Sequence, residues 1–149
     1  GIFRGETINT PSMLAVEDYL DTLKWAEGLG GLSGLLGRVA DNNKVLGDWV
    51  DASNWAGFLC VEDANRSTTS VCLVITDPDV LALDSDAQAA IAKKIASLLD
   101  GEAIAYDIGA YRDAPAGLRI WAGATVQASD LAALTPWLDW AFATAKQDI

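Results

Sequence analysis

Two short polar segments of this chain contain the residue types that bind anions. In the first, Gly5–Met13, Asn9 and Thr10 precede Pro11 at the predicted start of a helix. Free backbone N–H groups and the positive end of the helix dipole attract anions there, and Asn and Thr side chains add donors. The same residue types are also ordinary helix caps, which need no ligand. The segment therefore leaves a phosphate site and a plain cap as two open interpretations.

The second segment, Tyr111–Trp121, places Arg112 and Arg119 on either side of a Pro/Gly turn. The planar guanidinium of arginine can bind a carboxylate or phosphate through two parallel hydrogen bonds. Arg119 lies between apolar residues of a predicted strand, where an arginine is costly unless it is paired or lines a cleft. Internal pairing with Asp107 or Asp113, or a solvated sheet face, is the alternative for Arg119. A surface position is the alternative for Arg112.

Other residues that could perform catalysis are scarce. The chain has no histidine, which excludes a histidine-based triad and histidine-ligated metals, and we expect no metal site. Cys60 and Cys72 both lie in apolar runs and are expected to be buried free thiols. The lysines fall on polar faces of predicted helices, at positions 24, 44, 93, 94 and 146. We therefore expect no lysine here that forms a Schiff base, and no catalytic residue in this chain.

Composition limits the possible partners. The 149 residues are 51% hydrophobic, which predicts one globular domain, and the formal net charge is −11. Such acidity disfavours binding to nucleic acid or to an anionic membrane surface. No apolar run approaches the roughly 20 residues of a spanning helix, so a cytoplasmic protein is expected. The chain begins at Gly1 without Met, which fits either a fragment or the remnant of a tag.

Hydrophobic periodicity predicts an α+β fold. Four helices are expected: from Thr10–Pro11 to Gly28, from Ser33 to Val50, from Ser85 to Gly101, and from Ser129 to Lys146. Four strands are expected, at residues 57–61, 69–76, 103–107 and 117–122. The order is then α-α-β-β-α-β-β-α, a small, mainly antiparallel sheet of about four strands with helices packed on it.

Two local features of the predicted helices are specific enough to test. Ser85 and Gln88 form a capping box for the third helix. Pro136 should kink the last helix, or restart it with Thr135 as the new cap.

The order and spacing of the motifs resemble the C-terminal part of the phosphoserine aminotransferase family, class-V, fold-type-I enzymes that use pyridoxal phosphate. Gly5–Met13 resembles the family's Thr-Asn-Thr-Pro stretch, and Arg66–Val71 resembles its small-domain strand entry. Tyr111–Arg119 resembles its substrate-binding arginine loop, and Gly123–Thr125 continues the match. The resemblance covers essentially the whole chain.

The resemblance implies roles for single residues. Asn9 and Thr10 would bind the cofactor phosphate of the neighbouring subunit in a homodimer. Arg119 would hold the α-carboxylate of a small acidic amino-acid or keto-acid substrate. Arg112 would contact the substrate phosphate or side-chain carboxylate. Tyr111 stands where family members have His, and the turn to Arg119 is one residue longer.

The resemblance also implies what lies elsewhere. The family's Schiff-base lysine belongs to a large cofactor-binding domain that this sequence lacks, so the chain alone should be inactive. Residues 1–30 would form a linking helix and residues 31–149 the α+β body of one small domain. The parent would convert phosphoserine and 2-oxoglutarate to 3-phosphohydroxypyruvate and glutamate in serine synthesis. Another class-V aminotransferase, acting on alanine, serine or glyoxylate, and a non-catalytic α+β ligand-binding or interaction module remain alternatives.

Overall fold

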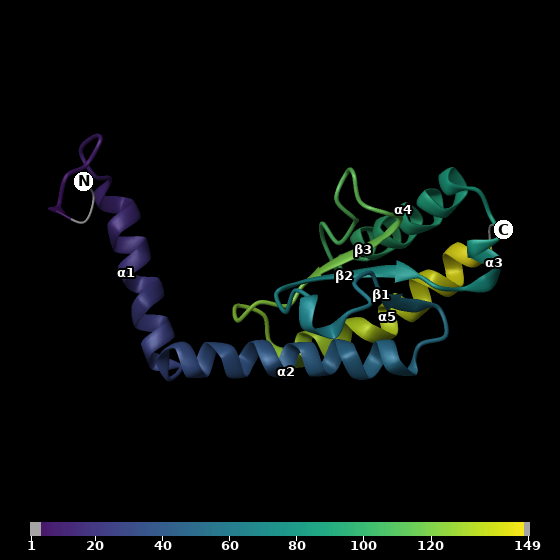
Figure 1. Ribbon diagram of the computed structural model, residues 1–149, viewed down its shortest axis with the longest axis horizontal. Helices are drawn as coiled ribbons and strands as arrows, with labels where there is room; N and C mark the ends of the chain where they lie inside the picture. Colours follow the sequence, from purple (N-terminus) through teal and green to yellow (C-terminus); the bar gives the residue numbers. More distant parts are fainter. Residues whose placement is uncertain (1–3, 148–149) are drawn as a thin grey trace. The chain divides into compact units, whose positions relative to one another are not determined.

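The computed structural model describes residues 4–147 (Figure 1). The chain divides into two compact units, Gly1–Gly37 and Arg38–Ile149. The first contains α1 (Met13–Gly28) and the start of α2 (Gly31–Ala52), and no residue of α1 is buried. Gly30 and Gly31 follow α1 with φ of 94° and 67°, values that glycine adopts without strain. The predicted end of this helix at Gly28 is confirmed.

The start of α1 differs from the sequence prediction. The helix begins at Met13, and its cap is Ser12, whose hydroxyl accepts a hydrogen bond from the N–H of Ala15 at 3.4 Å. Thr10 instead donates its backbone N–H to the side-chain oxygen of Asn9 at 2.8 Å. The prediction of Thr10 as the helix cap was therefore wrong. Because the helix begins at Met13, the side chain that reaches the free N–H of Ala15 in its first turn is that of Ser12.

The second unit contains a three-stranded antiparallel sheet, ordered β1 (Ala56–Phe58), β2 (Ser70–Ile75), β3 (Gly117–Trp121). In β2, buried residues alternate with half-buried ones, which gives the sheet one face toward the core. Cys72 and Arg119 are directly opposite each other on the other face, which we call the open face. Gly117 permits the close approach of β2, since a Cβ there would lie 2.0 Å from the carbonyl oxygen of Leu73.

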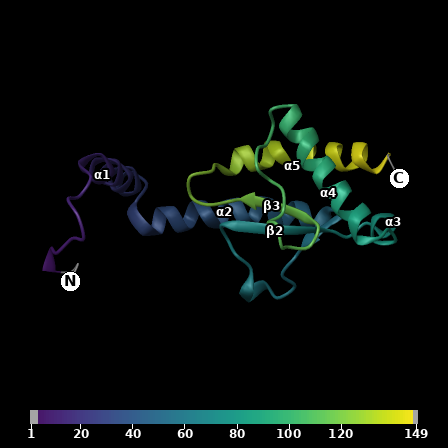
Figure 2. The same ribbon diagram turned by 90° about the horizontal axis from the view of Figure 1, so that it is seen from above.

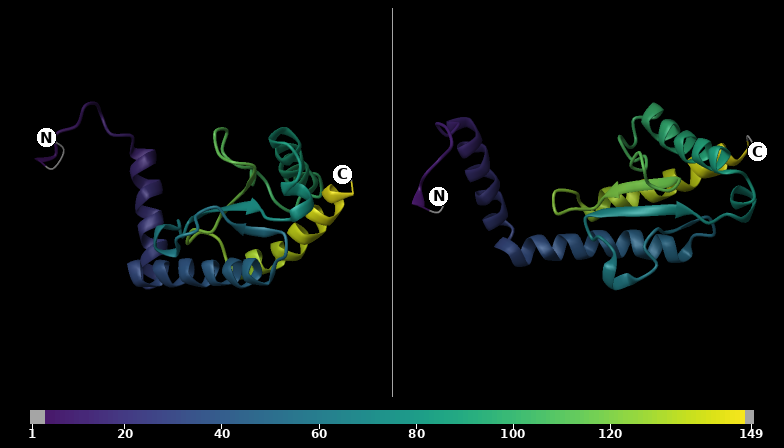
Figure 3. Two further views of the ribbon diagram at one scale, coloured as in Figure 1. Left: turned by 45° about the vertical axis from the view of Figure 1, so that its right-hand side comes forward. Right: turned by 45° about the horizontal axis from the view of Figure 1, so that its top comes forward.

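Helices cover the core face of the sheet. After the short α3 (Pro78–Leu81) come α4 (Ser85–Gly101) and, beyond β3, α5 (Ala128–Lys146). Figure 2 shows α4 and α5 lying against the strands, and Figure 3 gives two further views of this packing. The core joins these helices to α2 and the sheet; among its fully buried side chains are Leu46, Ile95, Leu99 and Leu138. The predicted α+β class is confirmed.

Two predicted details of the fold are wrong. Residues 103–107 form no strand: Ala103 and Asp107 have φ of 57° and 53°, which breaks extended backbone, and only an isolated bridge joins Gly109 to Leu118. The described sheet accordingly has three strands rather than four. The short helical segments Pro78–Leu81 and Asp63–Asn65 were not predicted.

The predicted helix caps also differ from those in the structure. The cap of α4 is Asp84, whose carboxylate accepts the N–H of Ala87 at 2.8 Å, so the Ser85–Gln88 capping box is wrong. Gln88 instead donates to the carbonyl oxygens of Leu81 and Leu83. Asp84, one residue before the predicted cap Ser85, caps the helix because its carboxylate reaches the free N–H of Ala87 in the first turn.

Helix α5 runs continuously through Pro136, so the predicted restart of the helix is wrong. A proline lacks the N–H that would bond the carbonyl four residues earlier, here that of Ala132. The hydroxyl of Thr135 donates to this carbonyl oxygen at 3.1 Å. The residue predicted to cap a new helix thus supplies the missing donor inside a continuous one.

Candidate functional site

Arg119 is the central residue of the candidate site. Its backbone N–H donates to the carbonyl oxygen of Ile108 at 2.8 Å, so the backbone at residues 108–109 pairs with the free edge of β3. Its guanidinium donates to the carboxylate of Asp107 at 3.2 Å and lies 5.9 Å from the centre of the Tyr111 ring. Of the two predicted partners, the structure selects Asp107 rather than Asp113.

Exposure determines what this ion pair does. About a third of the Arg119 side chain is exposed, whereas Asp107 is 92% exposed. An exposed pair contributes little to stability because water screens it. A carboxylate ligand could replace Asp107 at Arg119 with little loss of folding free energy. The arrangement thus holds an arginine on the open face of the sheet and pre-orients it for an anion.

Arg112 and Tyr111 line a cavity of about 410 Å³ between α4 and the loop of residues 109–117. Arg119 is not among the residues that line it. The two arginines therefore do not share one cavity, although Tyr111 lies beside both the cavity and the Arg119 guanidinium. Lys93 of α4 also lines the cavity.

The position of Lys93 was missed from the sequence, where it was placed on a polar helix face. Ala89 and Ala96 lie four and three residues from Lys93 and share its side of α4, and both line the same cavity, as does the adjacent Ala92. Residues at this spacing form one helix face. A lysine within a face of alanines is the signal that could have revealed it.

The turn after β3 is fixed by α2. The buried side chain of Asn42 donates through Nδ2 to the carbonyl oxygens of Ala122, Gly123 and Val126 at 3.0–3.1 Å. Arg38 donates to the carbonyl oxygen of Ala124 at 2.7 Å. These bonds satisfy buried backbone acceptors and hold the end of the strand that carries Arg119.

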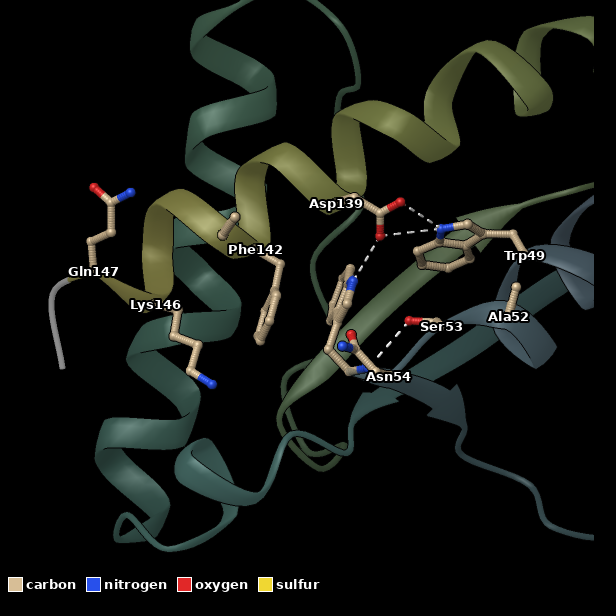
Figure 4. A pocket seen from close by; sticks show the side chains of 10 residues that line it. Trp49, Ala52, Ser53, Asn54, Asp139, Phe142, Lys146 and Gln147 are labelled. Atoms are coloured by element: carbon tan, nitrogen blue, oxygen red, sulfur yellow. Dashed lines mark hydrogen bonds between the residues drawn. The ribbon is translucent and has the colours of Figure 1, made fainter.

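A larger cavity, about 700 Å³, lies elsewhere in the second unit, between the C-terminal ends of α2 and α5 (Figure 4). Asp139 of α5 accepts hydrogen bonds from the indole N–H of Trp55 at 2.8 Å and of Trp49 at 3.2–3.3 Å. Trp55 stacks on Phe142 with ring centres 4.3 Å apart. The carboxylate therefore satisfies a buried indole and ties α2 to α5.

Near this cavity, Lys146 bonds Asp77 at 2.8 Å and Asp79 at 2.7 Å. Burial raises the pKa of the Asp77 carboxyl, but the hydrogen bond from Lys146 and those from the N–H groups of Val80 and Asp79 outweigh it. The pKa of Asp77 is thus held below its usual value. Hydrogen bonds to Asp77 and Asp79 raise the pKa of Lys146. Because Lys146 is charged and paired with both aspartates, it does not offer the cavity an unpaired cation.

Asn9 and Thr10, the predicted cofactor-phosphate ligands, lie in the first unit and are exposed. The first turn of the helix that follows contains no acidic residue. Because the Asn9 side-chain oxygen accepts the Thr10 N–H, its amide nitrogen is directed away from that bond. An exposed amide and hydroxyl next to a helix N-terminus without carboxylates suit a phosphate group.

No helix in residues 4–147 is both long and apolar enough to cross a membrane. Within the same range, His, Cys, Asp and Glu side chains form no group of three or more that could hold a metal ion.

Solved structures identify the class of fold. The chain superposes on a phosphoserine aminotransferase from Bacillus circulans subsp. alkalophilus with a TM-score of 0.74 and 19% sequence identity, over 91% of this chain and 34% of that one. Another phosphoserine aminotransferase structure gives a TM-score of 0.73 at 17% identity. The fold is therefore that of an α+β portion of an aminotransferase chain.

Sequence comparison finds similar proteins. The chain is 48% identical over 145 residues to the phosphoserine aminotransferase of Methanosarcina barkeri, across 97% of this chain and 36% of the relative. A putative phosphoserine aminotransferase of Mycobacterium sp. (strain KMS) is 31% identical over 138 residues. The chain is thus a homologue of the phosphoserine aminotransferases and corresponds to their C-terminal portion, which confirms the resemblance. It spans about a third of their length, and no protein-family profile matches it.

Proposed function

We propose that this chain is the small domain of a pyridoxal-phosphate-dependent phosphoserine aminotransferase. The parent enzyme would move the amino group between phosphoserine and 2-oxoglutarate, giving 3-phosphohydroxypyruvate and glutamate in serine biosynthesis. The relatives' names and the 48% identity to one of them support this assignment. The observation that carries it is Arg119, half-buried on the open face of the sheet and paired with an exposed carboxylate.

Within that enzyme, Arg119 would bind the substrate α-carboxylate, displacing Asp107. Tyr111 would pack against the Arg119 guanidinium and limit its motion. Arg112 would contact the substrate phosphate or the side-chain carboxylate of glutamate. The whole enzyme would be a cytoplasmic homodimer.

Asn9 and Thr10 would hold the cofactor phosphate of the neighbouring subunit through their amide and hydroxyl groups. Bound pyridoxal phosphate supplies the electron-accepting ring and carries the amino group between the two substrates. Residues 1–30 would link the α+β body of residues 31–149 to the large domain, which would contain the Schiff-base lysine. This chain by itself would therefore not transaminate.

The test is to recover the coding sequence upstream of Gly1 and express the extended chain with pyridoxal phosphate. The visible absorption of the bound cofactor is then recorded as phosphoserine, alanine or serine is added. A change with phosphoserine alone supports the proposal. A change with alanine or serine but not phosphoserine assigns the chain to a sister aminotransferase. No cofactor absorption would leave a non-catalytic module.

A further inference from the structure

The cavity of about 700 Å³ between the C-terminal ends of α2 and α5 combines aromatic rings with a carboxylate (Figure 4). Trp55 stacks on Phe142 with ring centres 4.3 Å apart. Trp49 meets Trp55 edge to face, with ring centres 5.6 Å apart. All three rings line the cavity, so they form one aromatic wall, and the Asp139 carboxylate lies beside it.

The Asp139 carboxylate still has room for a further hydrogen-bond donor. Its Oδ1 accepts the indole N–H of Trp55 at 2.8 Å, and its Oδ2 accepts that of Trp49 at 3.2 Å. Both donors are neutral, and within residues 4–147 no lysine or arginine forms an ion pair with Asp139. An ionised carboxylate can accept about four hydrogen bonds. Asp139 therefore offers a ligand an acceptor oxygen and an unpaired negative charge.

Two helix ends add to the negative potential of the cavity. The C-terminal end of a helix has a partial negative charge, because its last carbonyl groups have no partner within the helix. Helix α2 lines the cavity through Ala52 and has no basic residue in its last turn. In the described part of the chain, no group donates to the carbonyl oxygens of Asp51 and Ala52. Helix α5 contributes Lys146, whose single positive charge is paired with two aspartates.

We propose that this cavity binds a small organic amine in its ammonium form. The ammonium group would donate to Asp139 near the end of α2, and the carbon body would pack on the aromatic wall. Ammonium groups are attracted to the faces of aromatic rings, most strongly to tryptophan. The volume of about 700 Å³ lies within the usual range for small-molecule sites, roughly 300–1,000 Å³. A free amino acid would bind less well, because its carboxylate would be repelled by Asp139.

The binding test uses this chain without cofactor and three matched probes. Phenethylamine has an ammonium group and an aromatic body, phenethyl alcohol has the same shape without the charge, and phenylalanine adds a carboxylate to the amine. NMR signals of the indole N–H groups are followed as each probe is added. Phenethylamine should shift the signals of Trp49 and Trp55, and both other probes should bind about tenfold more weakly or less. Trp137 and Trp140 do not line the cavity and serve as internal references.

Asp139→Asn removes the charge but keeps a side-chain oxygen that can accept the Trp55 N–H. It should weaken phenethylamine binding about tenfold or more and change phenethyl alcohol binding by no more than about twofold. Asp100→Asn is the matched control: the same change at an exposed position of α4 outside the cavity should alter either affinity by no more than about twofold. Ala143→Leu, at an exposed position of α5 that lines the cavity, should weaken both probes by filling space. This variant keeps the test available if Asp139→Asn does not fold.

Three results would overturn the proposal. Equal affinities for phenethylamine and phenethyl alcohol would show that the cavity does not recognise charge. Equal effects of Asp139→Asn and Asp100→Asn would show that Asp139 does not bind the ammonium group. Signal shifts confined to Trp137 and Trp140 would place the amine elsewhere. Because the chain is measured without cofactor, the result does not depend on the proposed function, and either can fail while the other stands.

Discussion

The guanidinium of Arg119 donates to the carboxylate of Asp107. Asp107 directly precedes Ile108, whose carbonyl oxygen accepts the backbone N–H of Arg119 in β3. The left-handed conformation of Asp107, with φ of 53°, turns the chain at this point. Aspartate is one of the few residues that tolerate such a φ. The turn at the end of the predicted strand 103–107 therefore also supplies the counter-charge for the arginine.

Arg119→Gln should reduce carboxylate binding while leaving the fold intact. The Asp107 pair is exposed on one side, so the free energy of unfolding should change by less than about 1 kcal/mol. In the extended enzyme, kcat/KM should fall by a factor of about 100 or more, as expected when a charge-assisted contact to substrate is lost. Denaturant unfolding and steady-state kinetics measure the two effects. A loss of 3 kcal/mol or more would instead make Arg119 a structural residue.

Gly117→Ala should destabilise the sheet by about 2–4 kcal/mol, because the new methyl group would meet the Leu73 carbonyl oxygen of β2. Backbone cannot move aside as a flexible side chain can. Gly109→Ala is the control: a Cβ there has no atom within 4 Å, and its stability should change by less than about 1 kcal/mol. Urea denaturation of both variants gives the comparison. Equal stabilities would show that the strands can separate to admit a methyl group.

Thr135 and Pro136 should be energetically coupled. Pro136→Ala restores the N–H that bonds Ala132 and should stabilise the protein by about 1–3 kcal/mol. Thr135→Val removes the substitute donor and should cost about 0.5–1 kcal/mol in the parent chain. In the Pro136→Ala background the same change should cost less, because the carbonyl then has its own partner. Thermal unfolding of the four chains in a double-mutant cycle measures the coupling, and strictly additive effects would contradict it.

The extent of prediction from sequence differs between the helices and the sheet. Long amphipathic periods locate all four long helices, because burial of one face imposes a repeat that many residues share. The apolar residues of 103–107 look like a strand, but Ala103 has a left-handed backbone conformation directly after α4, where its N–H donates to the carbonyl oxygen of Asp100, and Asp107 has a second left-handed conformation. Caps at Ser12 and Asp84 fall within two residues of their predicted sites, since several nearby side chains compete for the same N–H groups.

The surroundings of Arg119 were predicted in part. Arg119 and its possible pairing with Asp107 followed from an arginine inside an apolar strand. The separation of Arg112 from Arg119, and the entry of Lys93 into the Arg112 cavity, did not follow. Both depend on how the loop of residues 109–117 lies over α4, which is a tertiary relationship between segments far apart in the chain.

Removing the Asp139 carboxylate should loosen the contact between α2 and α5. Asp139→Ala leaves the indole N–H of buried Trp55 without its acceptor, which should cost about 1–3 kcal/mol. Tryptophan fluorescence should shift to the red as water reaches the ring. Asp100→Ala, at an exposed position of α4, is the control and should leave the emission unchanged. An unchanged spectrum in Asp139→Ala would mean that stacking on Phe142 alone holds Trp55.

The Asp77–Lys146 pair predicts how stability depends on pH. The folded-state pKa of Asp77 is lowered, so its contribution is complete above the unfolded value of 3.8 and is lost as the pH falls through the lower folded pKa. The folded-state pKa of Lys146 is raised, so its contribution is complete below 10.5 and is lost as the pH rises through the higher folded pKa.

Asp77→Asn tests the acid limb without removing the α3 cap, since the amide oxygen can still accept the N–H groups of Asp79 and Val80. The variant should unfold more easily than the parent chain at pH 7. The difference should shrink as the pH falls below the unfolded value of 3.8 and through the lower folded pKa, where the parent carboxyl becomes neutral in the folded state too. Urea midpoints measured across this range give the curve. If the difference in urea midpoint between the two chains stayed constant down to the most acid pH, the charge of Asp77 would not contribute to stability. The effect of Asp77 would then come from its hydrogen bonds to the N–H groups of Asp79 and Val80 alone.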